Sequence, residues 1–173
     1  LESTGIVDSS RPCYCEVPLA KLTMLDDVKK SACFAKVRCG GLTPEAIPST
    51  ADLSAFIARC AALKLPFKAT AGLHHPVRSI QPLTYETDAP RAMMHGFLNV
   101  LLASSFAWHG EANIEAIISE TDPTAFRFDE RAHWRQSSLS HKQIQDARLN
   151  FVHAIGSCSF DEPVHDLQAL GLL

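Results

Sequence analysis

Residues 66–78 read PFKATAGLHHPVR, and this stretch carries both the signal for the fold and the strongest signal for a site. An apolar run that contains Lys68 ends in the small-residue turn Ala71-Gly72, and two histidines, a proline and Arg78 follow. Short apolar runs bounded by glycine and proline are typical of buried strands. A lysine inside a strand that is buried on both faces is rare without a partner, because an unpaired buried charge is costly. Lys68 is therefore a candidate site residue, and the alternative is a lysine that reaches solvent from a strand end.

Three further stretches share this pattern. They are CYCEVPL (13–19), CFAKVRCGG (33–41) and FVHAIGSCSF (151–160). The last two contain the small-residue turns Gly40-Gly41 and Gly156-Ser157. The sequence therefore predicts strands near residues 13–19, 33–39, 66–71 and 151–158.

Helical patterns lie between these strands. The clearest helix lies within residues 47–65, where Ser49 and Asp52 form an N-cap signature. Its apolar face consists of Leu53, Phe56, Ile57, Cys60 and Leu63. Further helices are expected at 22–31, 92–108, 112–120, 141–150 and 161–171, with a polar loop at 74–91. His95 and Asn99 share an apolar helix face, so we interpret them as partners in structural hydrogen bonds.

The alternation of strands and helices predicts a parallel α/β sheet whose strands follow the order of the chain, with the helices on one side. We expect a single α/β domain over residues 1–173, with a helical excursion at 110–150 before the last strand. Four such βα units resemble half of a (β/α)8 (TIM) barrel. A half-barrel leaves two strand edges and its inner face uncovered. We therefore expect a second half, from residues that precede Leu1 in a longer chain or from a second copy of this chain.

The composition excludes several classes of partner. Of the 173 residues, 46% are apolar and 20% are charged, and the formal net charge is −3. Such a charge provides no basic surface for nucleic acid or anionic lipid. The most apolar segment, 97–108, has about half the length that spans a bilayer, and no signal-peptide layout opens the chain. We expect a cytoplasmic protein with a small anionic metabolite as its partner, and no nucleic-acid or membrane partner.

The cysteines predict reduced thiols. The chain is neither short nor cysteine-dense, and its six cysteines include no C-x-x-C pair. Cys60 should be buried on the apolar face of its helix. We expect no metal and no cofactor.

Charged residues alternate along the first three expected strands. Side chains in a strand point to opposite faces with a period of two. Lys36 and Arg38 therefore share one side of their strand, and Lys68 and Thr70 share one side of theirs. If the strands are parallel neighbours, Glu16, Lys36, Arg38 and Lys68 converge at one end of the sheet. Lys68, Lys36 and Glu16 are our catalytic candidates, and Arg38 is a candidate for substrate binding.

Two histidines and an arginine follow the third strand. Adjacent residues rarely both reach one metal ion, so we interpret one of the pair as a hydrogen-bonding or acid–base group. His74 is the catalytic candidate, and His75 is placed beside the substrate. Arg78 is a candidate for holding an anionic group with its bidentate fork, and the alternative is a surface arginine.

The turns after the strands are candidates for an anion site. Ligands of parallel α/β sheets bind beyond the carboxyl ends of the strands, and free N–H groups at a helix start attract anions. The alternative is that Ser159 and Asp161 only cap the last helix. The substrate-binding candidates in these turns are Gly40, Gly41, Thr70, Gly72, Gly156, Ser157 and Ser159.

Five sequence blocks, AKVRCGG, PSTADLSAFIARC, PFKATAGLHHPVR, HGFLNVLLAS and GSCSFDEP, together resemble the C-terminal half of a family of uncharacterised proteins. The resemblance spans about residues 13–173 and implies that whole members have a front half as well. It implies no catalytic assignment. Cys39 stands where the family pattern K-x-R-T-G-G has threonine, a change that leaves the turn intact.

A shorter similarity concerns chemistry. KVRCGG and FKATAGL each place a lysine shortly before a small-residue turn, which is similar to the lysine-bearing strands of deoxyribose-phosphate-aldolase-type (β/α)8 enzymes. In that family one lysine forms an imine with the substrate and a second lowers its pKa. The similarity implies aldolase or lyase chemistry at Lys68 and Lys36.

Three functions compete on these observations. The first is an enzyme, lyase-like, that acts on a small anionic carbonyl compound at the C-terminal face of a TIM-like barrel. The second is a non-catalytic module that binds a ligand or a subunit through the same basic surface. The third is a metal-dependent hydrolase with His74, His75 and Asp161 as ligands.

Overall fold

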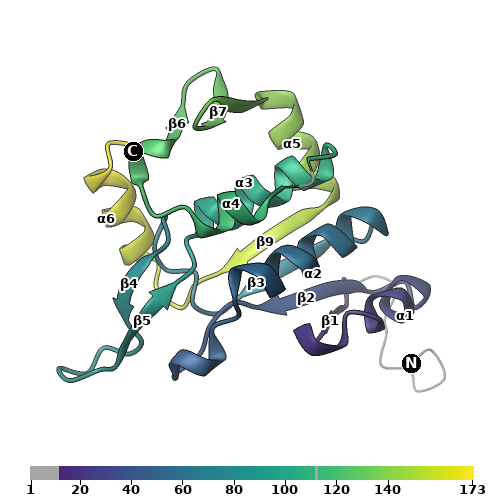
Figure 1. Ribbon diagram of the computed structural model, residues 1–173, viewed down its shortest axis with the longest axis horizontal. Helices are drawn as coiled ribbons and strands as arrows, with labels where there is room; N and C mark the ends of the chain where they lie inside the picture. Colours follow the sequence, from purple (N-terminus) through teal and green to yellow (C-terminus); the bar gives the residue numbers. More distant parts are fainter. Residues whose placement is uncertain (1–11, 112) are drawn as a thin grey trace.

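A four-stranded parallel sheet forms the centre of the computed structural model, which describes residues 12–111 and 113–173 (Figure 1). Its strands are β1 (Tyr14–Glu16), β2 (Phe34–Arg38), β3 (Phe67–Thr70) and β9 (Val152–Gly156). They pair in the order β1-β2-β3-β9, and every pair is parallel. The predicted strands, their direction and their order are therefore confirmed, and each strand is shorter than the predicted one.

Helices cover one face of this sheet. They are α1 (Met24–Lys30), α2 (Thr50–Ala62), α3 (Phe97–Trp108) and α5 (His141–Asn150). Figure 1 shows α2 and α3 side by side on the same side of the sheet. Ala35, Val37, Phe67 and Ala69 of the sheet are fully buried beneath them. This packing of small strand residues against large helix residues forms the hydrophobic core.

The helix α2 begins as its sequence predicts. Ser49 has extended backbone geometry and its hydroxyl accepts a hydrogen bond from the Asp52 N–H at 3.1 Å. The apolar face is buried at Leu53, Phe56, Ile57 and Cys60. Phe56 then packs edge-on against Phe67 of β3 with ring centroids 5.4 Å apart, within the usual range for aromatic pairs.

The predicted loop at 74–91 and helix at 92–108 need correction. Residues Ser79–Pro82 (β4) and Arg91–Met94 (β5) form an antiparallel hairpin, and α3 starts only at Phe97. The apolar Met93 and Met94 pair with β4 in place of extending the helix. Gly96 is the N-cap of α3, in extended conformation.

His95 and Asn99 have the structural role that we predicted. His95 Nε2 contacts the carbonyl oxygen of Pro48 at 2.8 Å. The Asn99 side chain accepts from the backbone N–H of Arg78 at 3.0 Å and donates to the carbonyl oxygens of Ile117 and Glu120, each at 2.8 Å. These bonds hold the start of α3 against the backbone at residues 48 and 78 and against the end of α4, and burial lowers the pKa of His95.

The segment 110–150 also differs from the prediction, because it is only partly helical. The helix α4 (Glu115–Ser119) is followed by an antiparallel sheet of β6 (Phe126–Phe128), β7 (Arg131–Trp134) and β8 (Ser137–Ser140). Single-turn 3-10 helices lie at Leu19–Lys21 (η2), Pro44–Ala46 (η3) and Pro123–Ala125 (η4). The predicted helix at 141–150 is confirmed as α5, and α6 (Asp161–Ala169) follows β9.

None of the helices in the described part of the chain is long and apolar enough to cross a membrane.

We expect Gly96→Ala to destabilise the protein by about 1–3 kcal/mol, a typical cost of overpacking. A Cβ atom at this position would lie 2.5 Å from the Pro76 carbonyl oxygen and 2.6 Å from the Arg78 nitrogen, and both are backbone atoms that cannot move aside alone. Urea unfolding at neutral pH measures the change. Gly156→Ala is the matched control, since its Cβ would meet the Thr70 methyl group at an ordinary 3.4 Å. Equal stability of the two variants would contradict the interpretation.

Candidate functional site

The face of the sheet opposite the helices carries most of the predicted strand residues. Glu16 is the register partner of Lys36, Lys36 is the partner of Lys68, and Arg38 is the partner of Thr70. All of these residues are half-buried or exposed, whereas the strand neighbours of Lys36, Arg38 and Lys68 on the helix side are buried. We call this surface the open face. The structure therefore brings Glu16, Lys36, Arg38 and Lys68 together on one surface.

Glu16 pairs with two of the three cations. Its Oε2 atom lies 2.7 Å from Lys36 Nζ, and its Oε1 atom lies 3.6 Å from Arg38 Nε. The hydrogen bond from Lys36 holds the pKa of the Glu16 carboxyl below its usual range, against the opposite effect of burial. The charges of Lys36 and Arg38 are thus partly offset by one carboxylate.

Lys68 has a different partner. Its Nζ atom lies over the ring of Tyr14, 4.2 Å from the centroid, where the negative face of the ring attracts an ammonium group. In the described residues no carboxylate forms an ion pair with Lys68, because Glu16 is turned to Lys36 and Arg38. Glu16 therefore contacts Lys36 and Arg38 and does not pair with Lys68.

The sequence reasoning missed His153. Its Nδ1 atom lies 2.9 Å from the Tyr14 hydroxyl, and its ring packs edge-on against Phe34 of β2. The β3–β9 register shifts between Phe67 and Lys68, so that Lys68 is paired with Ala154. The contact of His153 with Tyr14 joins β9 to β1, which are not neighbours in the sheet, and no pattern within one strand predicts it. Burial lowers the pKa of His153 and raises that of Tyr14.

The turns after β2, β3 and β9 meet at the carboxyl edge of the sheet. A Cβ atom on Gly40 would lie 2.9 Å from the Gly72 Cα atom, so the first two turns are in backbone contact. Gly72 has a φ of 72°, which favours glycine. Gly156 is the register partner of Thr70. The loops at 70–73 and 156–159 therefore lie side by side, as we predicted, and Gly41 packs against Ala46 beside them.

His74 joins the loops after β3 and β9. Its Nδ1 atom lies 2.8 Å from the Ser157 hydroxyl oxygen and 3.7 Å from a carboxylate oxygen of Glu162. The Ser159 hydroxyl accepts a hydrogen bond from the Glu162 N–H, which supports the capping role of this serine at α6. Cys158 Sγ lies against the imidazole of His74. This thiol was not among the predicted site residues.

His75 and Arg78 lie in a different place from the open face. His75 Nδ1 contacts Asp166 Oδ2 at 2.6 Å, and both residues line a pocket of about 240 Å³ with Arg78 and Leu170. Burial lowers the pKa of Arg78. No open-face residue lines this pocket. The structure thus separates these two predicted substrate-binding residues from Lys68.

The residues proposed for a hydrolase metal do not gather. Among residues 12–111 and 113–173, the group whose ligand atoms lie within 4.8 Å of one another consists of Cys13, Cys15 and Cys33, and it contains no histidine. Thiolates suit soft ions such as zinc, so these three cysteines could hold one. Burial is the main cause that raises the pKa of Cys15 to about 11. All six cysteines are free thiols, and Cys60 is buried as predicted.

Two further pockets test where a ligand fits. A pocket of about 430 Å³ borders the open face at Glu16 and Arg38, a volume in the usual range for small-molecule sites. Glu45 and Asp52 also line it, so an anion would meet three carboxylates there. This pocket therefore disfavours an anionic ligand, and the cationic part of the open face lies at Lys68.

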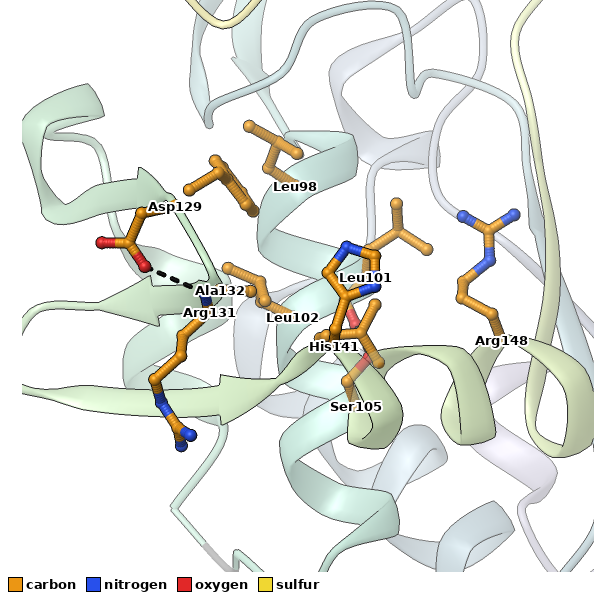
Figure 2. Close-up of a pocket in the computed structure, with 11 residues that line it drawn as sticks. Leu98, Leu101, Leu102, Ser105, Asp129, Arg131, Ala132, His141 and Arg148 are labelled. Carbon is orange, nitrogen blue, oxygen red and sulfur yellow. Dashed lines mark hydrogen bonds between the residues drawn. The ribbon is translucent and has the colours of Figure 1, made fainter.

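The other pocket lies far from the predicted residues in the fold. Figure 2 shows leucines of α3, among them Leu98 and Leu101, facing His141 and Arg148 of α5. Its volume is about 180 Å³, below the usual range for such sites, and its lining is mainly apolar. The Ser105 hydroxyl in its lining donates to the Leu101 carbonyl oxygen at 2.8 Å, and no hydrogen bond joins it to His141 in the described part of the chain.

Comparison with known protein families, with curated proteins and with solved structures finds no match for this chain.

We expect the Glu16→Gln variant to lose less than about 1 kcal/mol of stability at neutral pH, the usual worth of an exposed ion pair. Because Lys36 lowers the pKa of Glu16 in the folded state, this stabilisation exists above the unfolded pKa of about 4.3 and disappears as the pH falls through the folded value. Urea unfolding of wild type and variant at pH 7 and near pH 3 measures both halves of the prediction. Glu130→Gln is the control, since Glu130 has no ion pair in the described structure. A difference that persists undiminished in acid would contradict it.

Proposed function

We propose that the protein is a lyase-like enzyme that binds a small anionic carbonyl compound on the open face, with Lys68 as the residue that meets the carbonyl carbon. The observation that carries the proposal is the position of Lys68. Its amine is half-buried on the open face over Tyr14, and no carboxylate of the described residues pairs with it. A lysine so placed can attract an anion first and react with its carbonyl group afterwards.

The neighbours of Lys68 have opposing effects on its reactivity. The Tyr14 ring attracts the charged end of the Lys68 side chain, and Lys36 on the next strand repels it. Glu16 weakens the effect of Lys36 by pairing with it. A substrate on the open face excludes water from the Lys68 amine. The amine then adds to the carbonyl carbon, and loss of the carbonyl oxygen as water gives an imine.

We also propose that the sheet is half of a (β/α)8-type barrel. Four parallel strands in chain order, with helices on one face and half-exposed charges on the other, fit the inside and outside of such a half. A second half would cover the open face and complete the site. It would come from another part of a longer chain or from a second copy of this one.

Borohydride trapping tests the role of Lys68. Incubation with small anionic aldehydes and ketones, followed by borohydride, should reduce an imine to a stable adduct on Lys68 that peptide mass spectrometry locates. Lys68→Arg should abolish the adduct, because a guanidinium cannot form the imine. Lys64→Arg is the matched control, since Lys64 lies over Trp108 at 4.1 Å in a comparable arrangement outside the site. Labelling spread evenly over surface lysines and unchanged in Lys68→Arg would refute the proposal.

Light scattering tests whether a second copy of the chain supplies the other half of the proposed barrel. The chain alone should form dimers at micromolar concentration, because a second copy is then the only source of cover for the open face. A Lys68→Glu variant keeps the side chain long but reverses its charge, so it should shift the equilibrium if the faces meet. A monomer that binds no apolar dye would contradict the half-barrel.

A further inference from the structure

Cys158 and His74 form a second chemical centre that the proposed function does not use. Cys158 Sγ lies 3.7 Å from Nε2 and 3.8 Å from Nδ1 of His74. The thiol is exposed, while the side chain of His74 is only 16% exposed. Since Sγ is nearly equidistant from both nitrogens, it lies against the ring and within reach of Nε2.

The hydrogen bonds around Ser157 assign the tautomer of His74. The Ser157 hydroxyl lies 2.7 Å from the Ser159 carbonyl oxygen, which has no proton, so Ser157 donates its single proton there. The Ser157 oxygen also lies 2.8 Å from His74 Nδ1, and with its proton already used it accepts from Nδ1–H. Nε2 of the neutral ring is therefore unprotonated. The nitrogen near the thiol is a free base.

The surroundings favour a neutral ring at rest and a charged ring after proton transfer. Burial is the main cause that lowers the pKa of His74, and His75 acts in the same direction. Glu162 of α6 acts in the opposite direction from 3.7 Å, and the Tyr85 hydroxyl donates to the same carboxylate at 3.1 Å. Glu162 thus lies where it stabilises an imidazolium, as the carboxylate of a catalytic triad does.

We propose that Cys158 is a nucleophile with His74 as its general base and Glu162 as a positioning residue, and that the centre acts on small acyl compounds, either esters or thioesters. Cys158 gives its proton to His74 Nε2, and the thiolate attacks the acyl carbon. A C–S bond forms, the bond to the leaving group breaks, and the leaving group departs with the proton from His74. Water then hydrolyses the thioester on Cys158 and regenerates the thiol.

Alkylation by iodoacetamide measures the reactivity of the Cys158 thiol directly. At pH 7 the rate at Cys158, followed by peptide mass spectrometry, should be at least about tenfold higher in wild type than in His74→Asn, the order expected for loss of a general base. Asparagine keeps an N–H donor near Ser157 but has no group in place of Nε2. His165→Asn is the matched control, since His165 is an exposed histidine of α6. Equal rates in wild type and a folded His74→Asn would overturn the proposal.

If His74→Asn does not fold, the pH profile of the alkylation rate at Cys158 in the wild type tests the Cys158–His74 pair instead. With a paired base, the rate at Cys158 should fall by less than about threefold from pH 8 to pH 6, because the neutral His74 ring accepts the thiol proton during the attack and no free thiolate is needed. An unassisted thiol loses about tenfold per pH unit below its titration. A tenfold loss per unit at Cys158 would overturn the pair. Glu162→Gln should slow alkylation of Cys158 across this range, because it removes the charge that stabilises the imidazolium formed on proton transfer, and an unchanged rate would remove Glu162 from the proposal.

An acyl probe tests the substrate class. Incubation with p-nitrophenyl acetate should release p-nitrophenol in a burst and leave an acetyl group on Cys158 that is absent in Cys158→Ser and slow to form in His74→Asn. Acetylation spread over lysines with none on Cys158 would refute the acyl assignment. The outcome is independent of Lys68, so Lys68→Arg separates the two proposals. It should abolish borohydride trapping while leaving the acetylation of Cys158 intact.

Discussion

The parallel pairing of β2 with β3 is the constraint on which both the core and the open face depend. Its register places Lys36 beside Lys68 and Arg38 beside Thr70. Because side chains alternate, the same register buries Val37 and Ala69 beneath the helices. At the strand ends it brings Gly40 against Gly72, where a Cβ atom would lie 2.9 Å from the opposite Cα. Apolar packing on one face thereby determines which cations meet on the other.

That register places two like charges, Lys36 and Lys68, on neighbouring strands of the open face. Each of the two ammonium groups has a different partner. Neighbouring strands lie about 4.8 Å apart, so two lysines in register bring like charges close together. Glu16 pairs with Lys36 at 2.7 Å, and the Tyr14 ring lies under Lys68 at 4.2 Å. A carboxylate holds its lysine more firmly than a ring does. Lys68 is consequently the lysine that an incoming anion can attract away from its partner.

The sequence predicted those features that follow from local pattern and from strand alternation. The cap of α2 at Ser49, the bounds of α5, the strand order and the convergence of Glu16 with Lys36 and Lys68 all belong to this group. The hairpin of β4 and β5 and the sheet of β6, β7 and β8 were not predicted from the sequence. Their strands are short and contain polar or charged residues in place of an apolar run, and pairing across turns stabilises them.

The missed site residues have a related explanation. His153 lies on the open face because Val152 before it pairs with Phe67 on the helix side, and its contact with Tyr14 joins β9 to β1, which are not neighbours in the sheet. Cys158 and His74 are 84 residues apart in sequence, and only the pairing of β3 with β9 joins them. A histidine pair and a lone cysteine each have many structural explanations when read separately.

The two candidate centres share the pair of strands β3 and β9 but depend on it in different ways. Lys68 projects from within β3, so its position is as fixed as the sheet itself. His74 and Cys158 lie beyond the strand ends, and their mutual position depends on the bonds of Ser157 to His74 and to Ser159. Loss of the Ser157 hydroxyl would free the imidazole to adopt its other tautomer, which places a proton on Nε2 and removes the base. The lysine centre therefore depends on strand pairing alone, whereas the thiol centre also depends on one hydroxyl that fixes a proton.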